Sequence, residues 1–164
     1  MRTFRTRRVG SGKSRRDCRG QAQVEFILTI VFVLVLIFGI FELFMLIYTT
    51  NVLADAAKEG VRYAVVHGSN TTNPGTASTG TCSANSGSST PSSVVGQVCN
   101  FAALSFHDVS GMTVTVTYPD GGTSNAAPNR VQVQVSYAYA PFMALGWEAA
   151  VINLGAAAEG RIFI

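Results

Sequence analysis

The run Gly10-Ser11-Gly12-Lys13-Ser14 has the form of the last part of a phosphate-binding loop. The complete pattern needs a further glycine five residues before Gly12, where this chain has Arg7. It also needs a strand before the loop and a helix after it, and the residues on both sides are polar and basic. The run therefore does not indicate nucleotide binding.

His67 and His107 are the only histidines in the chain. No Cys-x-x-Cys or His-Glu-x-x-His spacing places either of them in a recognisable metal site, and no Gly-x-Ser-x-Gly motif marks a nucleophile. Asp108 follows His107 directly, but adjacency in sequence does not make a catalytic pair. We expect two helix-end or loop histidines, no metal, no cofactor and no enzymatic activity.

Three cysteines are present, Cys18, Cys82 and Cys99, which is an odd number for an exported chain. The odd number is explained if Cys18 stays in the cytoplasm or is removed with the residues around it. Cys82 and Cys99 could then form a disulfide in an oxidising compartment. The alternative is that both are unpaired, small residues of the hydrophobic core.

The charge of the chain is divided sharply along its length. Residues 1–20 contain eight bases and one acid, a net charge of +7, whereas residues 21–164 contain four bases and eight acids. Basic residues directly before a long apolar run follow the positive-inside rule for membrane proteins, so membrane orientation is a better reading of them than nucleic-acid binding. We expect 1–20 to be a cytoplasmic leader that is disordered away from the membrane.

A long apolar helix should follow the leader. Residues 26–48 are apolar except for Glu42 and Thr29, and about 20 such residues cross a bilayer. The segment to His67 contains no proline, and apolar residues recur at helical spacing along one narrow face (Leu53, Ala56, Ala57, Gly60 and Ala64). The sequence predicts one long helix over 21–67, well formed from about Val24, with a transmembrane span at 26–48.

The remaining residues, 68–164, should form a small exported domain. Residues 68–93 are rich in Gly, Ser, Thr and Asn and read as a loop, and 93–106 has the spacing of a short helix. Alternating apolar residues predict an antiparallel pair of strands, with one apolar face made of Met112, Val114, Val116 and Tyr118 and the other of Val131, Val133, Val135, Tyr137 and Tyr139. A third strand is expected near 152–164, although its Gly-Ala-Ala-Ala-Glu-Gly run has weak strand preference. The expected fold class is α+β.

Two acids at the margins of the apolar run need an explanation, because a carboxylate in a membrane usually has a role. Glu42 lies near the outer end, where it either reaches water or makes a specific contact. Glu25 lies one residue before the run, where the positive end of the helix dipole would favour an acid. The residues that precede Glu25 suggest a more specific role.

The stretch from Arg19 to Phe26, RGQAQVEF, resembles the cleavage site of type IV prepilins. Together with the apolar run and the later segment YTTNVLADAAKEGVRYAVV, it is similar to the TadE-like pseudopilins of the Flp/Tad tight-adherence pilus system. The resemblance covers about residues 19–67. It implies that a membrane peptidase cuts after Gly20, that Gln21 becomes the first residue, and that Glu25 is the glutamate of the mature chain. Because the Glu25 carboxylate could neutralise the new ammonium group on Gln21, we expect Glu25 to set the register between packed helices.

The resemblance also implies a place and a set of partners. The chain would be a minor pilin or pseudopilin in the bacterial inner membrane, crossing once, with its domain on the periplasmic or extracellular side. Its partners would be the prepilin peptidase, other pilins and the assembly platform. Two alternatives are a membrane-anchored binding module that uses the loop 68–93 and, from the scattered polar residues of the domain, a membrane-bound enzyme.

Overall fold

The computed structural model describes six segments, residues 17–68, 76–83, 93–106, 108–120, 126–142 and 151–163. The chain divides into two compact units, Met1–Ile40 and Phe41–Ile164. The Gly-Ser-Gly-Lys-Ser run, most of the basic leader and His107 lie outside the described segments. The observed elements are those of an α+β protein, as the sequence predicts.

The helix α1 runs from Asp17 to Val66 and so begins earlier than the expected start near Val24. Residues 17–20 are helical, although the sequence placed them in a disordered leader. No proline occurs between Asp17 and Val24, and the helix continues through Gly20. The far end agrees with the prediction, since the last helical residue is Val66 and His67 already lies in a bend.

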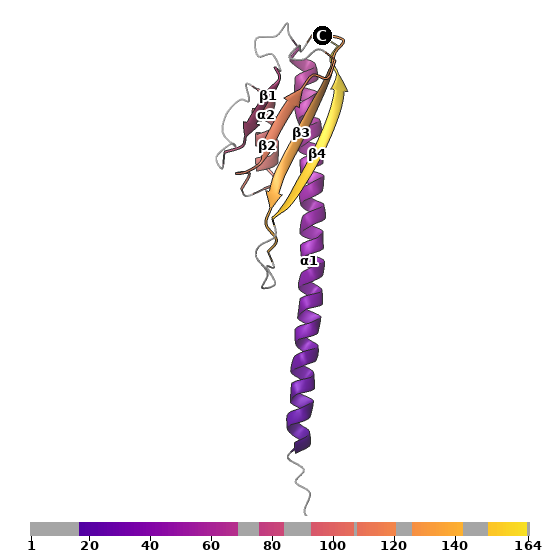
Figure 1. The fold of residues 1–164 in the computed structure, drawn as a ribbon, viewed down its shortest axis with the longest axis vertical. Helices are drawn as coiled ribbons and strands as arrows, with labels where there is room; N and C mark the ends of the chain where they lie inside the picture. Colours follow the sequence, from indigo (N-terminus) through magenta and orange to yellow (C-terminus); the bar gives the residue numbers. More distant parts are fainter. Residues whose placement is uncertain are drawn as a thin grey trace, which may run out of the picture. The chain divides into compact units, whose positions relative to one another are not determined.

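The second unit is built on a four-stranded antiparallel sheet in the order β1-β2-β3-β4 (Figure 1). Strand β2 is Thr113–Thr117, β3 is Arg130–Tyr139 and β4 is Ile152–Arg161. The short helix α2, Val94–Ala103, begins with Ser93, whose hydroxyl accepts a hydrogen bond from the Gly96 amide at 3.1 Å. These elements confirm the expected helix and all three expected strands.

The first strand, β1, spans Ser78–Thr81 and corrects the expectation that 68–93 is a loop throughout. It pairs with β2 so that Thr79 lies opposite Thr115, and the Cys82 amide extends the ladder by donating to the Met112 carbonyl at 2.9 Å. The strand consists of Ser, Thr and Gly, so it has no apolar alternation for a sequence pattern to detect. Its partners and the covalent link beside it hold it in the sheet.

The core of this unit lies between one face of the sheet and the two helices. Val114, Val131, Val133 and Val135 are fully buried and alternate with exposed or half-buried polar residues. The expected face of α1 meets them, because its members are all buried: Leu53, Ala56, Ala57, Gly60 and Ala64. On the opposite side of α1, Lys58 pairs with Asp55 at 3.0 Å and Arg62 with Glu59 at 3.9 Å.

Small residues on β4 allow α1 to approach the sheet closely. Ala156, Ala158 and Gly160 face the core and lie opposite Val135, Val133 and Val131 of β3, respectively. A Cβ atom at Gly160 would lie 2.5 Å from Cγ1 of Val61. The weak strand preference of this segment therefore reflects the space that α1 needs, and the pairing with β3 overrides the preference.

Candidate processing and assembly site

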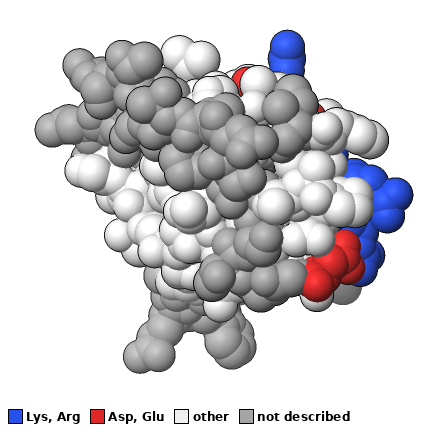
Figure 2. Space-filling model, turned by 90° about the horizontal axis from the view of Figure 1, so that it is seen from above, with Lys and Arg blue, Asp and Glu red and all other residues white. Residues whose placement is uncertain are grey.

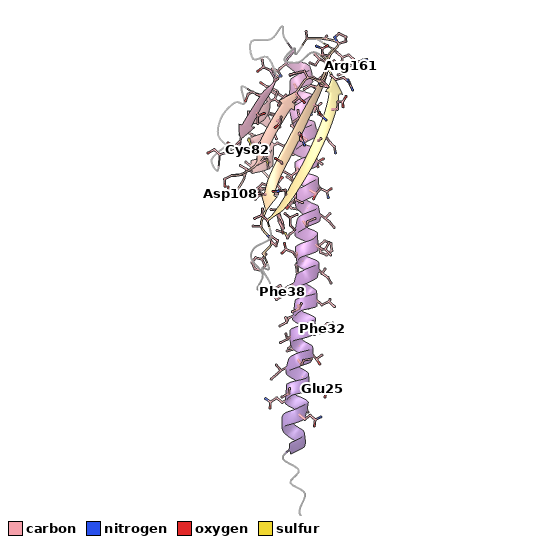
Figure 3. The ribbon with its side chains drawn as sticks, in the orientation of Figure 1. Glu25, Phe32, Phe38, Cys82, Asp108 and Arg161 are labelled. Atoms are coloured by element: carbon pink, nitrogen blue, oxygen red, sulfur yellow. A yellow bond between two sulfur atoms is a disulfide. The ribbon has the colours of Figure 1, made fainter. Side chains whose placement is uncertain are left out.

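The residues of the expected cleavage site lie in the first turns of α1. Gly20, Gln21 and Glu25 are all exposed, and no atom lies within 4 Å of the position that a Cβ would take at Gly20. Gln21 and Glu25 are separated by four residues, so they share one face of the helix. Glu25 lies near the lower end of α1 in Figure 3, and its carbonyl accepts a hydrogen bond from Thr29 at 2.9 Å.

The helix surface that follows this site is apolar on every side. The large apolar residues between Val24 and Ile40 are 41% to 70% exposed. They belong to the helix Gly20–Val66, which is long and apolar enough to cross a membrane. A soluble helix normally shows a polar face. An exposed helix that is apolar all round is compatible with single-pass membrane anchoring.

Glu42 makes specific contacts inside the second unit. Its Oε1 accepts a hydrogen bond from the Tyr139 hydroxyl at 2.6 Å, and its Oε2 accepts one from the Phe142 amide at 3.1 Å. A tyrosine hydroxyl is protonated at physiological pH, so Tyr139 can donate this hydrogen bond. The partners are about a hundred residues away in sequence, and no local pattern identifies them.

Cys82 and Cys99 form a disulfide that joins the end of β1 to α2. Both residues are buried, at 6% and 3% exposure, and both belong to the hydrophobic core. The structure therefore shows the disulfide and not the unpaired alternative, although both residues are also part of the core. Cys18 lies in the first turn of α1, far from both in sequence.

Sequence reasoning missed an ion cluster on the polar side of β3 and β4. Arg130 donates to both oxygens of Asp120, at 2.8 to 3.1 Å, and to Glu159 at 3.0 Å. Figure 2 shows an acidic group directly beside a basic group at one side of the molecule. The hydrogen bonds from Arg130 lower the pKa of Asp120 to about 2.

This cluster predicts a specific pH dependence of stability. The pKa of Asp120 falls from its ordinary value of 3.8 in the unfolded chain to about 2 in the folded one, so its contribution is complete above pH 3.8 and is lost as the pH falls towards 2. We expect the melting temperature of Asp120→Asn to lie below that of the parent at neutral pH and to converge with it in this acidic window. Thermal denaturation of both proteins across the window measures the difference, and parallel curves would contradict the assignment.

His67 joins no cluster of ligands in the described segments, and His107 lies outside them. The ring of His67 stacks on Tyr63 at a centroid distance of 3.9 Å, one turn away on α1. Within the same segments, no group of three or more His, Cys, Asp or Glu side chains is arranged to hold a metal ion. Glu148, another scattered polar residue, lies outside the described segments.

Fold and site together define a class of protein, an α+β domain joined to one exposed apolar N-terminal helix of membrane-spanning length. Residues 20–62 match the model of the family described as TadE-like protein, which confirms the resemblance over this part of the chain. The match begins at Gly20 and ends within α1, so it includes the expected cleavage site, the apolar helix and part of the core face. It indicates a membrane-associated component of the Tad pilus machinery. No curated protein and no solved structure matches the chain.

Proposed function

We propose that the chain is a minor pilin or pseudopilin that serves as a structural part of a Flp/Tad-type pilus or secretion machine. The observation that carries this proposal is the spacing of Gly20 and Glu25 at the exposed start of an apolar helix, within the TadE-like match. A retained apolar helix can pack with the helices of other subunits, and the domain on its outer end would present a surface. This role needs neither a cofactor nor a catalytic group.

The chemistry of the site supports cutting after Gly20. Hydrolysis of that peptide bond would create an ammonium group on Gln21, one helical turn from the Glu25 carboxylate. The carboxylate of the same chain or of a neighbour could neutralise this charge, and the attraction between the two is stronger in a low dielectric than in water. Because the pair forms only at one axial offset, Glu25 would set the register between packed helices.

The charge distribution supports the orientation of the chain. The net charge of +7 in residues 1–20 favours a cytoplasmic N-terminus, and the remaining residues carry a net negative charge. In this orientation the prepilin peptidase would meet the leader at the inner membrane, and the domain would lie on the exported side. The other partners would be sister pilins and the assembly platform.

The N-terminal residue of the protein in its native membrane tests the proposal. Mass spectrometry of the intact protein should show a chain that begins at Gln21 in cells with the prepilin peptidase and at Met1 or Arg2 in cells without it. A chain that keeps its leader in both strains would favour a simple membrane-anchored binding module.

The substitution Glu25→Ala separates cleavage from assembly. We expect the variant to insert into the membrane and to lose most of its recovery with the other pilus subunits, because the Gln21 ammonium would lack its partner. Cross-linking in membranes followed by quantitative mass spectrometry measures this recovery. Gln23→Ala, an exposed polar neighbour in the same turn, is the matched control, and equal recovery of the two variants would remove the register role.

A further inference from the structure

Two exposed apolar side chains mark one end of the second unit. Phe142 follows β3 and is 84% exposed, and Leu104 follows α2 and is 85% exposed. Isolated exposed hydrophobic residues are common on soluble proteins and need no explanation. These two differ because hydrogen bonds connect their immediate surroundings to the apolar part of α1.

Those hydrogen bonds place the backbone at Phe142 and at Ser105 along α1. The Phe142 amide donates to Glu42, and the Tyr48 hydroxyl donates at 3.3 Å to the carbonyl of Ser105, the residue after Leu104. Glu42 and Tyr48 are six residues apart, which is about 9 Å along a helix. Phe142 therefore lies at the level of Glu42, and Leu104 lies about two turns further along α1.

The length of the apolar run places the level of Glu42 within the hydrocarbon. The uninterrupted stretch Phe26–Phe41 contains 16 residues, or about 24 Å of helix, whereas the hydrocarbon core is about 30 Å thick. A span of about 20 residues from Phe26 reaches Met45 and includes Glu42. The carboxylate can be accommodated there because Tyr139 and Phe142 donate hydrogen bonds to it.

The surface of α1 beside these contacts remains apolar and exposed. Phe41, Leu43, Phe44 and Ile47 are 51% to 65% exposed and belong to the same compact unit as Phe142. Aromatic side chains cluster at this end as well, since Phe106 lies edge-on to Tyr48 and stacks on Tyr137. Tyrosine is enriched where a protein passes from hydrocarbon to the headgroups.

We propose that this end of the domain is seated in the lipid bilayer, with Phe142 inserted among the acyl chains and Leu104 at the shallower headgroup boundary. This apolar surface contacts lipid, because it continues the apolar surface of the membrane-spanning stretch. Glu42 interrupts the surface, but Tyr139 and Phe142 of the domain donate hydrogen bonds to its carboxylate. The hydrogen bonds to Glu42 thus have a second consequence, which is to hold Phe142 at the depth of that residue. The inference rests on the membrane anchoring in the proposed function and is independent of cleavage and assembly.

Tryptophan fluorescence in vesicles tests the insertion. The full chain is reconstituted into vesicles of phosphatidylethanolamine and phosphatidylglycerol that contain phosphatidylcholine brominated either near the glycerol or near the methyl end of its acyl chains. Trp147→Phe removes the only native tryptophan, and Phe142→Trp, Leu104→Trp or Phe163→Trp then introduces one. Phe163 is the matched control, because it is also highly exposed, at 77%, but follows β4 beyond Arg161, at the opposite end of the β3–β4 pair from Tyr139.

We expect blue-shifted emission and strong quenching by bromines near the glycerol for Phe142→Trp. Leu104→Trp should be quenched less, and Phe163→Trp should emit as in water and lose no intensity. The three sites are exposed, so tryptophan fits without repacking. Difference spectra against the Trp147 parent give the same comparison if Trp147→Phe lowers the melting temperature.

The outcomes distinguish the inference from the anchoring on which it rests. If the protein floats with the vesicles but Phe142→Trp is quenched no more than Phe163→Trp, the chain is anchored and the domain end is not in lipid. If the protein does not float with the vesicles, the anchoring fails and the inference fails with it. The inference is supported if quenching is strongest for Phe142→Trp, weaker for Leu104→Trp and absent for Phe163→Trp.

Discussion

Removal of the Cys82–Cys99 disulfide should lower the melting temperature of the domain by roughly 10 °C, which corresponds to about 3 kcal/mol. The bond closes a loop with a sequence separation of 17, and in the chain-entropy model this loop restricts the unfolded state by about that amount. Cys82→Ala/Cys99→Ala is the variant, and thermal denaturation of the full chain in detergent is the measurement.

The disulfide should matter most for β1, because this strand contains no large apolar residue. Hydrogen exchange of the β1 amides should accelerate in the double variant, while β3 keeps its protection. Cys18→Ala is the control for loss of a thiol and should leave the melting temperature unchanged. The assignment fails if reductant leaves the melting temperature of the parent unchanged after free thiols have been blocked.

Gly60→Leu should destabilise the domain by about 3 kcal/mol or more, through overpacking of the core. A Cβ at this position of α1 would lie 2.5 Å from Cγ2 of Val98 on α2 and 3.2 Å from Cγ1 of Val133 on β3. Both valines are fully buried, so neither can move without displacing its own neighbours. The domain should unfold at a markedly lower temperature, as measured by circular dichroism.

Gly39→Leu is the matched control for this substitution, since Gly39 also lies inside α1 and has no atom within 4 Å of its Cβ position. It should leave the melting temperature of the domain within error of the parent. Gly60→Ala should fall between the two, because the gain in helix propensity, about 1 kcal/mol, offsets part of the overlap. Equal melting temperatures for Gly60→Leu and Gly39→Leu would mean that α1 does not pack at Gly60 as described.

The packing of α1 in the core determines where the domain can be separated from the rest of the chain. The outer half of α1 is part of the domain core, because Leu53, Ala56 and Ala57 have no exposed surface. A domain cut from the chain after α1 would lose this half of its core. The second unit therefore includes the outer half of α1 in its own core.

The sequence alone determined the features that depend on local composition and period. Three features are local patterns of composition and spacing: the charge division around Gly20, the apolar run from Phe26 and the narrow face that includes Gly60. They can be read from neighbouring residues without knowledge of the tertiary structure. The alternation in β2 and β3 is equally local, so their buried valines were predictable. The resemblance at Gly20 and Glu25 is also carried by adjacent residues.

Only the tertiary structure decided the features that depend on residues distant in the chain. The strand β1 exists because β2 offers hydrogen bonds and Cys99 holds Cys82, and neither cause is visible in a run of Ser, Thr and Gly. Glu42 finds its donors in Tyr139 and Phe142 across about a hundred residues. The packing of α1 on the sheet brings such residues together. Their separation in sequence does not indicate that they are neighbours.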